Sequence, residues 1–484
     1  GKNALDAAVT GDNNTAIGKA VLTNLTSGTF NVGLGGSALT SHTTGAQNTA
    51  CGYAALEQQT TASLNTGMGF AALRNNTANN NTAIGHNAAL STTSGGANTA
   101  LGAAAFDANT TGANNVALGI NALGANTTAN LNTAVGAAAL GANTTGAQNV
   151  AIGSYALDAN TTASNNTAVG YLALTENTTG TQNIAVGNFT LDANTTGIQN
   201  TAIGHQALSA NTTANENTAV GAYALEDNTT GSNNVAVGNT ALANNTTGIQ
   251  NTVLGRSAAF NNLTGNNLIA IGVNSLLANT SGSENTGIGS FALDANTTGA
   301  NNVGIGYSAL GVNTTGNNMV AVGNYALDAN TTGSSNTAIG YVCLSANTTG
   351  ADNVAVGREA LQHSTEGDSN TAIGFRALRA NTTADYNTAV GRFAMGANTT
   401  GIRNVGIAPF SLDANTTGNY NVSIGYTALS SNTTADYNTG VGYQALFANT
   451  TGTQNTAIGA LALDAATTGG QNTAVGYQAL TDHT

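Results

Sequence analysis

The sequence lacks most of the features that define a nucleic-acid-binding protein or a membrane protein. Of its 484 residues only 6% are charged, one is proline, two are cysteine and none is tryptophan. With nine lysines and arginines and a net charge of −13, it has no cluster of cations to neutralise phosphates, so we expect no nucleic-acid partner. No stretch approaches the roughly 18 to 20 apolar residues of a membrane helix, so we expect no membrane contact within this segment.

The chain instead repeats one 17-residue unit, seen most clearly from Asn132 to Gln148. One glycine of the repeat, here called the landmark glycine, returns at 29 positions from Gly1 to Gly476, and only Ala408 replaces it. All steps are of 17 residues except one of 16, between residues 69 and 85. The pattern predicts a single continuous repeat array over residues 1–484, which begins and ends within a repeat and is expected to be a piece of a longer chain.

The repeat predicts an all-β fold, a parallel β-solenoid of about 28 coils. The residue before each landmark glycine is always apolar, and the residue four after it is Leu in 25 of 29 cases, so these two rows are the predicted core. Glycine in every repeat disfavours helix, whereas β-branched residues favour strands. We expect two short strands per coil, here residues 132–135 and 138–140, and a turn at 143–146 with Gly or Asn at positive φ. The Asn that begins each repeat is expected to form an amide ladder with its neighbours.

A second pair of rows, two before and three after the landmark glycine, is mostly alanine. Because side chains alternate along a strand, the first of these rows should point away from the predicted core. A strand that is apolar on both faces is usually buried on both, so we predict that the small face packs against other copies, as a parallel homotrimer. The alternative is that small residues suit a cramped corner of a single-chain solenoid.

Catalytic and metal-binding constellations are not evident. His42, His86, His205, His363 and His483 lie in scattered coils and cannot converge on a dyad or a metal. Cys51 and Cys343 are too far apart in a stacked repeat to form a disulfide and are interpreted as small core residues. We therefore expect no enzyme activity, no cofactor and no metal in this segment.

Acidic residues recur five positions after the landmark glycine, never in adjacent coils, as at Asp158, Asp192, Asp294 and Asp328. Stacked carboxylates would repel each other at the spacing of neighbouring strands. We interpret these residues as solvated surface charges.

The turn column of the repeat, seven positions after the landmark glycine, carries twenty Asn-x-Ser/Thr triplets. One interpretation is that Asn-Thr-Thr is favourable turn chemistry, with side chains capping backbone groups. The other is a glycan coat attached to these asparagines. The candidate attachment residues are Asn109, Asn126, Asn143, Asn160, Asn177, Asn194, Asn211, Asn228, Asn245, Asn262, Asn279, Asn296, Asn313, Asn330, Asn347, Asn381, Asn398, Asn415, Asn432 and Asn449.

The motifs Asn-Thr-Ala-Ile-Gly-x-x-Ala-Leu and Asn-Val-Ala-Val-Gly resemble the head repeats of YadA-like trimeric autotransporter adhesins. They also resemble the Asn-Thr-x-Ile-Gly…Thr-Thr-Gly repeats of phage tail-fibre and bacterial surface proteins. The resemblance covers the whole chain and implies a left-handed parallel β-roll on a cell or virion surface that is used for attachment. The matching residues, such as Ile152, Gly153 and Leu157, are structural, and this repeat is longer than that of the adhesin heads.

We therefore expect a non-enzymatic, extracellular structural fibre for surface display or adhesion, with host or surface glycans as partners. The alternative is an extracellular filament subunit that polymerises end to end, with or without a glycan coat. A third interpretation takes the regular Thr rows as an ice-binding surface. Aromatic residues just after the landmark glycines, such as Tyr171, Tyr307 and Tyr341, could stack on sugars.

Overall fold

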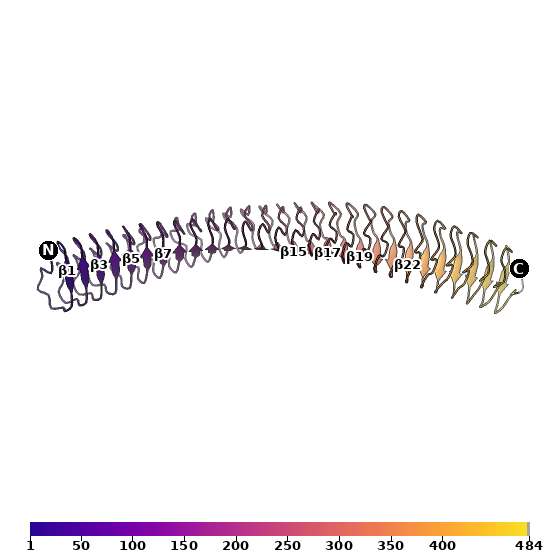
Figure 1. The fold of residues 1–484 in the computed structure, drawn as a ribbon, viewed down its shortest axis with the longest axis horizontal. Coiled ribbons are helices and arrows are strands. Elements are labelled where there is room, and N and C mark those ends of the chain that lie inside the picture. Colours follow the sequence, from indigo (N-terminus) through magenta and orange to yellow (C-terminus); the bar gives the residue numbers. More distant parts are fainter. Residues whose placement is uncertain (482–484) are drawn as a thin grey trace. The chain divides into compact units, whose positions relative to one another are not determined.

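The structure is a computed structural model that describes residues 1–481. The chain divides into two compact units, Gly1–Thr247 and Gly248–Thr484. Each unit is a parallel β-solenoid in which every 17-residue repeat forms one coil with one strand. Figure 1 shows the coils following one another in sequence order within each unit, with their strands side by side. The predicted fold class and period are confirmed, and no helix occurs among the described residues.

All strands are three residues long. Those of the first unit are β1 (Thr15–Ile17), β2 (Val32–Leu34), β3 (Thr49–Cys51), β4 (Thr66–Met68), β5 (Thr82–Ile84), β6 (Thr99–Leu101), β7 (Val116–Leu118), β8 (Thr133–Val135), β9 (Val150–Ile152), β10 (Thr167–Val169), β11 (Ile184–Val186), β12 (Thr201–Ile203), β13 (Thr218–Val220) and β14 (Val235–Val237). Those of the second unit are β15 (Thr252–Leu254), β16 (Ile269–Ile271), β17 (Thr286–Ile288), β18 (Val303–Ile305), β19 (Val320–Val322), β20 (Thr337–Ile339), β21 (Val354–Val356), β22 (Thr371–Ile373), β23 (Thr388–Val390), β24 (Val405–Ile407), β25 (Val422–Ile424), β26 (Thr439–Val441), β27 (Thr456–Ile458) and β28 (Thr473–Val475).

Successive strands of each unit pair in parallel with equivalent residues opposite each other. In β8 and β9, for example, Thr133 lies opposite Val150 and Val135 opposite Ile152. The 16-residue repeat keeps this register, because Thr66 of β4 still lies opposite Thr82 of β5. The missing residue is therefore absorbed in the turns, where no strand pairing constrains the count.

The rest of each coil is not a second strand, so the prediction of a strand at residues 138–140 is wrong. Ala138 and Leu140 have positive φ values of 55° and 52°, and the segment is a turn. Its backbone bonds to the next coil, as in the Leu140 N–H donating to the Ala156 carbonyl at 3.0 Å. In successive coils the residues at these two positions adopt the left-handed backbone conformation, which alanine and leucine normally avoid. Burial of that leucine and the bond to the next coil stabilise the conformation.

The interior of the coil differs from the predicted core in one row. The leucine row is buried, as with Leu140 and Leu157, which are fully covered. The row before the landmark glycine faces outward instead, and Ile152 is 41% exposed. The middle residue of the strand is usually alanine and points inward; Ala151, for example, is fully buried. Alternation along the strand was correctly expected, but the inward and outward faces were assigned the wrong way round, because the narrow interior beside the strand takes mainly small side chains, Val253 being the largest in the inward row.

The landmark glycine is required by both conformation and space. Gly153 has φ 135°, where only glycine is unstrained. A Cβ on Gly153 would also collide with the carbonyl of Gly170 in the next coil. The turn glycine Gly146, in contrast, is not at positive φ, so the expected role of Gly in that turn is wrong; a Cβ there would meet Asn143 Oδ1 at 2.6 Å.

A separate finding concerns membranes. None of the described residues forms a helix long and apolar enough to span a bilayer.

Candidate functional site

The asparagines of the turn column line the inside of the coil. Asn143 Nδ2 donates to Asn126 Oδ1 of the preceding coil at 3.1 Å and to the Gly146 carbonyl at 3.0 Å. Asn160 Nδ2 in turn donates to Asn143 Oδ1 at 2.8 Å. All twenty candidate glycan-attachment asparagines are fully buried. A glycan bonded to Nδ2 has no space in the folded coil, so this burial favours the interpretation of the column as turn chemistry.

The Asn that begins each repeat forms a second ladder. Asn132 Oδ1 accepts a hydrogen bond from the backbone N–H of Asn149 at 2.9 Å, and Asn149 Nδ2 donates to the Ala163 carbonyl at 2.9 Å. The expected ladder is therefore present, but its links pass mainly through backbone groups rather than from amide to amide. The two ladders satisfy polar groups that the coil buries on both sides of its turn.

The outward side chains of the strands form a surface that we call the sheet face. It consists of the first and third residues of every strand, for example Thr201 and Ile203 in β12. The first residue is Thr, Val or Ile and the third is Ile, Val, Leu, Met or Cys, so the 28 strands contribute no charged side chain. Many of the third residues are 36–59% exposed. The small-residue face, which we predicted as the contact with other copies, lies inside the coil and cannot serve that purpose.

Beside the sheet face, aromatic side chains stack from coil to coil in several columns. One column in the second unit is covered by arginines: Arg376 lies over the Phe375 ring at 4.9 Å and over Phe393 at 5.7 Å. Arg358 also reaches the Phe375 ring, at 5.7 Å. These distances are those of cation–π interactions.

The arginines of this column also bind one carboxylate, that of Glu359. Glu359 Oε2 contacts Arg376 Nε at 2.6 Å and Arg379 Nε at 3.3 Å, and Oε1 contacts Arg358 Nη2 at 3.0 Å. The Glu359 side chain is only 9% exposed. The hydrogen bond from Arg376 lowers the pKa of Glu359, with Arg358 acting in the same direction. The chain thus builds one complete cluster of aromatic rings, a carboxylate and cations.

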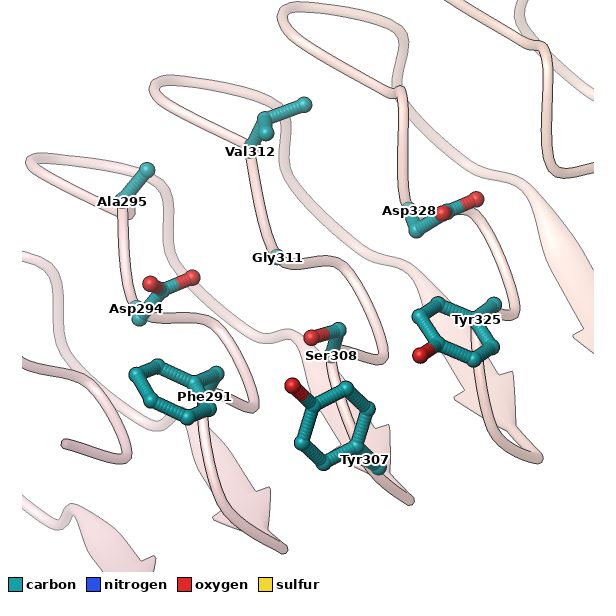
Figure 2. A pocket seen from close by; sticks show the side chains of 9 residues that line it. All are labelled: Phe291, Asp294, Ala295, Tyr307, Ser308, Gly311, Val312, Tyr325 and Asp328. Atoms are coloured by element: carbon teal, nitrogen blue, oxygen red, sulfur yellow. The ribbon is translucent and has the colours of Figure 1, made fainter. Parts of the chain in front are cut away.

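A hollow of about 410 Å³ lies in the second unit, in three successive coils; we call it the notch. In the coil of Gly306 the second position after the landmark glycine is Ser308 and the fifth is Gly311, whereas the neighbouring coils carry large side chains there. The notch is thus a gap one coil wide, as Figure 2 shows. Its walls are Phe291 and Asp294 on one side and Tyr325 and Asp328 on the other.

The carboxylates of the acidic row are less solvated than expected. Burial raises the pKa of Asp294 and of Asp328. Burial likewise raises the pKa of Asp158 and Asp192. These four aspartates are therefore surface residues that are only partly solvated, because neighbouring coils cover part of each side chain. A signal for the notch was present in the sequence, since Gly311 interrupts the acidic row between two aspartates, but it was not recognised.

Metal-binding and redox groups are not assembled. Within residues 1–481 no three His, Cys, Asp or Glu side chains come together in a way that could hold a metal ion. His42 is buried and bonds through Nε2 to the Gly45 carbonyl at 2.9 Å, and burial lowers its pKa. His483 lies outside the described residues. Both cysteines are free thiols, and burial raises the pKa of Cys343 to about 12.

Comparison with known proteins does not place the chain in a family. No protein-family model matches the chain, and no curated protein matches it.

Proposed function

We propose that the chain is a non-enzymatic structural fibre protein whose copies associate side by side through the sheet face, on the outside of a cell or virion. The observation that supports this proposal is the exposure of an uncharged, largely aliphatic face in every strand of both units. Large exposed apolar patches on soluble proteins mark interaction surfaces. The solenoid then provides reach and rigidity, and the remaining columns are displayed for attachment.

The size of the sheet face is sufficient for a stable interface. Each unit contains 14 strands, and each strand contributes two outward side chains. Full burial of an aliphatic side chain removes roughly 60–120 Å² from water, so outward side chains roughly a quarter to two-fifths exposed leave on the order of 700–1,000 Å² per unit. A standard interface uses about 800 Å² from each partner. The predicted parallel homotrimer thus has an alternative contact surface to the buried alanine row.

A second copy is the partner that fits this face best. Its outward rows repeat at the spacing of paired strands, about 4.8 Å, so a copy aligned with the stack matches them strand for strand within each unit. The acidic row, including Asp158 and Asp192, lies five positions beyond the landmark glycine and not on the strands. Two negatively charged chains can therefore join their sheet faces without placing the acidic row between them.

Light scattering on the full chain tests this association, since one chain has a mass of 47.5 kDa. The native protein is expected at a multiple of this mass, and the double variant Ile152→Lys/Ile203→Lys at 47.5 kDa, because lysines on both copies would repel. Thr145→Lys/Thr196→Lys places the same charges on exposed turn positions and should leave the mass unchanged. A native mass of 47.5 kDa at every concentration would contradict the proposal. Antibody labelling of intact source cells or virions tests the location.

The same face supports a second candidate, an ice-binding function. Seventeen of the 28 strands begin with Thr, and the structure places this residue on the outward side of the sheet next to an aliphatic row. A regular array of hydroxyl and methyl groups could order water. Thermal hysteresis measured at high protein concentration distinguishes the two, because a surface covered by a second copy produces none.

A further inference from the structure

The notch combines aromatic rings and carboxylates without a cation. Its rings are in edge contact across the coils, with centroids 5.8 Å apart for Phe291 and Tyr307 and 5.4 Å apart for Tyr307 and Tyr325. Tyr307 is 42% exposed and Tyr325 38% exposed. Figure 2 shows the rings in a row beneath the level of the two carboxylates, with Gly311 between the latter.

Within residues 1–481, the carboxylates of the notch have no positively charged partner. Ion pairs of the described residues involve Glu57 and Glu359, and neither Asp294 nor Asp328 takes part in one. No Lys, Arg or His occurs between Arg256 and Arg358. The charges of Asp294 and Asp328 are therefore not compensated by any cationic side chain within that stretch of the sequence.

Another part of the same chain shows how aromatic rings and a carboxylate combine with cations. In the coils around Glu359, arginines lie over the rings of the aromatic column and bind the carboxylate. The rings of that cluster lie at the first or second position after the landmark glycine, as Tyr307 and Tyr325 do in the notch. The notch therefore has rings at the same repeat positions as the arginine cluster, and its two carboxylates lie at the fifth position after the landmark glycine instead of the second, where Glu359 lies. It lacks the arginines, and beside its rings it has an open space of about 410 Å³.

We propose that the notch binds a small organic cation, whose ammonium group lies between the carboxylates of Asp294 and Asp328 and against the Tyr307 ring. Two carboxylates attract the charge, and aromatic rings stabilise an alkylated ammonium group that water solvates weakly. Ser308 and Gly311 form the floor, and the methyl groups of Ala295 and Val312 contact the apolar part of the ligand. A neutral sugar would leave both charges uncompensated. This site does not depend on the proposed association, because its residues lie outside the sheet face.

Choline is a suitable probe, and 3,3-dimethylbutan-1-ol is its neutral analogue of the same shape. Ligand-observed NMR with the full chain at pH 7 and fixed ionic strength is expected to show saturable choline binding, with the alcohol and glucose bound at least tenfold more weakly. Asp294→Asn/Asp328→Asn keeps the shape and should weaken choline binding about tenfold or more. Gly311→Gln should abolish it by filling the notch.

A second hollow provides the matched control. It lies between Asp107 and Asp158 over Gly124 and Gly141, and no aromatic side chain lines it. Asp107→Asn/Asp158→Asn should leave choline binding unchanged. Circular dichroism verifies that all variants are folded. Absence of saturable choline binding, equal binding of the neutral alcohol or of glucose, or full binding by the Asp294→Asn/Asp328→Asn variant would each overturn the proposal.

Discussion

Replacement of Asn143 by alanine tests whether the buried amide ladder holds neighbouring coils together. The substitution removes the donor to Asn126 Oδ1 and the acceptor of Asn160 Nδ2. Asn126 Oδ1 then has no partner inside the coil, and Asn160 Nδ2 keeps only its bond to the Ala163 carbonyl. The Gly146 carbonyl is affected less, because Asn132 Nδ2 also donates to it at 2.9 Å.

The expected loss follows from the two groups left unsatisfied. A buried donor or acceptor without a partner costs about 1–3 kcal/mol, so the local free energy of opening should fall by about 2–4 kcal/mol, since Asn160 retains one bond. Each 1.4 kcal/mol corresponds to a factor of about ten, so amides in the affected coils should exchange roughly 30- to 700-fold faster.

Native-state hydrogen exchange read by mass spectrometry is the suitable assay, because a repeat array opens locally and a single unfolding midpoint averages over many coils. Peptides covering residues 126–160 should lose protection, whereas those several coils away should not. Asn143→Ser should lose less, since Ser364 occupies the same column and accepts a bond from Asn381 at 3.4 Å. Thr145→Ala, at an exposed turn position, is the control. Unchanged exchange in Asn143→Ala would refute the view that the ladder stabilises the stack.

Four further predictions concern single positions. Ala408 stands at a landmark position with φ 116°, so Ala408→Gly should relieve strain and stabilise its coils by about 1 kcal/mol, measured by local hydrogen exchange. Burial raises the pKa of Asp328, so the folded state binds its proton more tightly and the coil becomes more stable as pH falls through that raised pKa; Asp328→Asn should remove this dependence and stabilise the coil at pH 7. Bonds from its arginine neighbours lower the pKa of Glu359, so its contribution is present above the ordinary pKa of a glutamate and is lost as pH falls through the lowered value; in Glu359→Gln that acid-induced loss should disappear from local exchange. Cys343, buried with a pKa of about 12, should resist a thiol reagent at pH 8 in the folded chain, so that at most Cys51 reacts before urea is added.

The period, the parallel stacking and the fold class could be predicted because they depend on which residues recur, and recurrence is visible in the sequence. The leucine row was identified for the same reason. The strand faces could not be assigned from hydropathy, because Ala151 is less hydrophobic than Ile152 and yet lies inside. The width of the interior decides which face of the strand points inward. This width is a property of the tertiary structure and cannot be read from the alternation of side chains in the sequence.

The candidate sites were predicted less well, for two physical reasons. Asn143 reads as a surface turn residue, and nothing local reveals that its amide bonds to two equivalent asparagines inside the stack. The left-handed conformations of Ala138 and Leu140 are likewise imposed by neighbouring coils against the preference of these residues. The notch at Gly311 depends on what adjacent coils carry, so the glycine between two aspartates of the acidic row indicates a hollow only once the repeats are stacked in space.

The in-register pairing of equivalent residues has a consequence for how such a chain changes over generations. Because each coil contacts its neighbours through the same atoms, the gain or loss of one whole repeat by recombination within the gene leaves every remaining contact type intact. Such an event changes the stack by one strand spacing, about 4.8 Å. The 16-residue repeat between β4 and β5 shows that a single-residue loss is also tolerated when it falls in a turn. The length of the stack can therefore change in small steps during evolution while the packing of its interior stays the same.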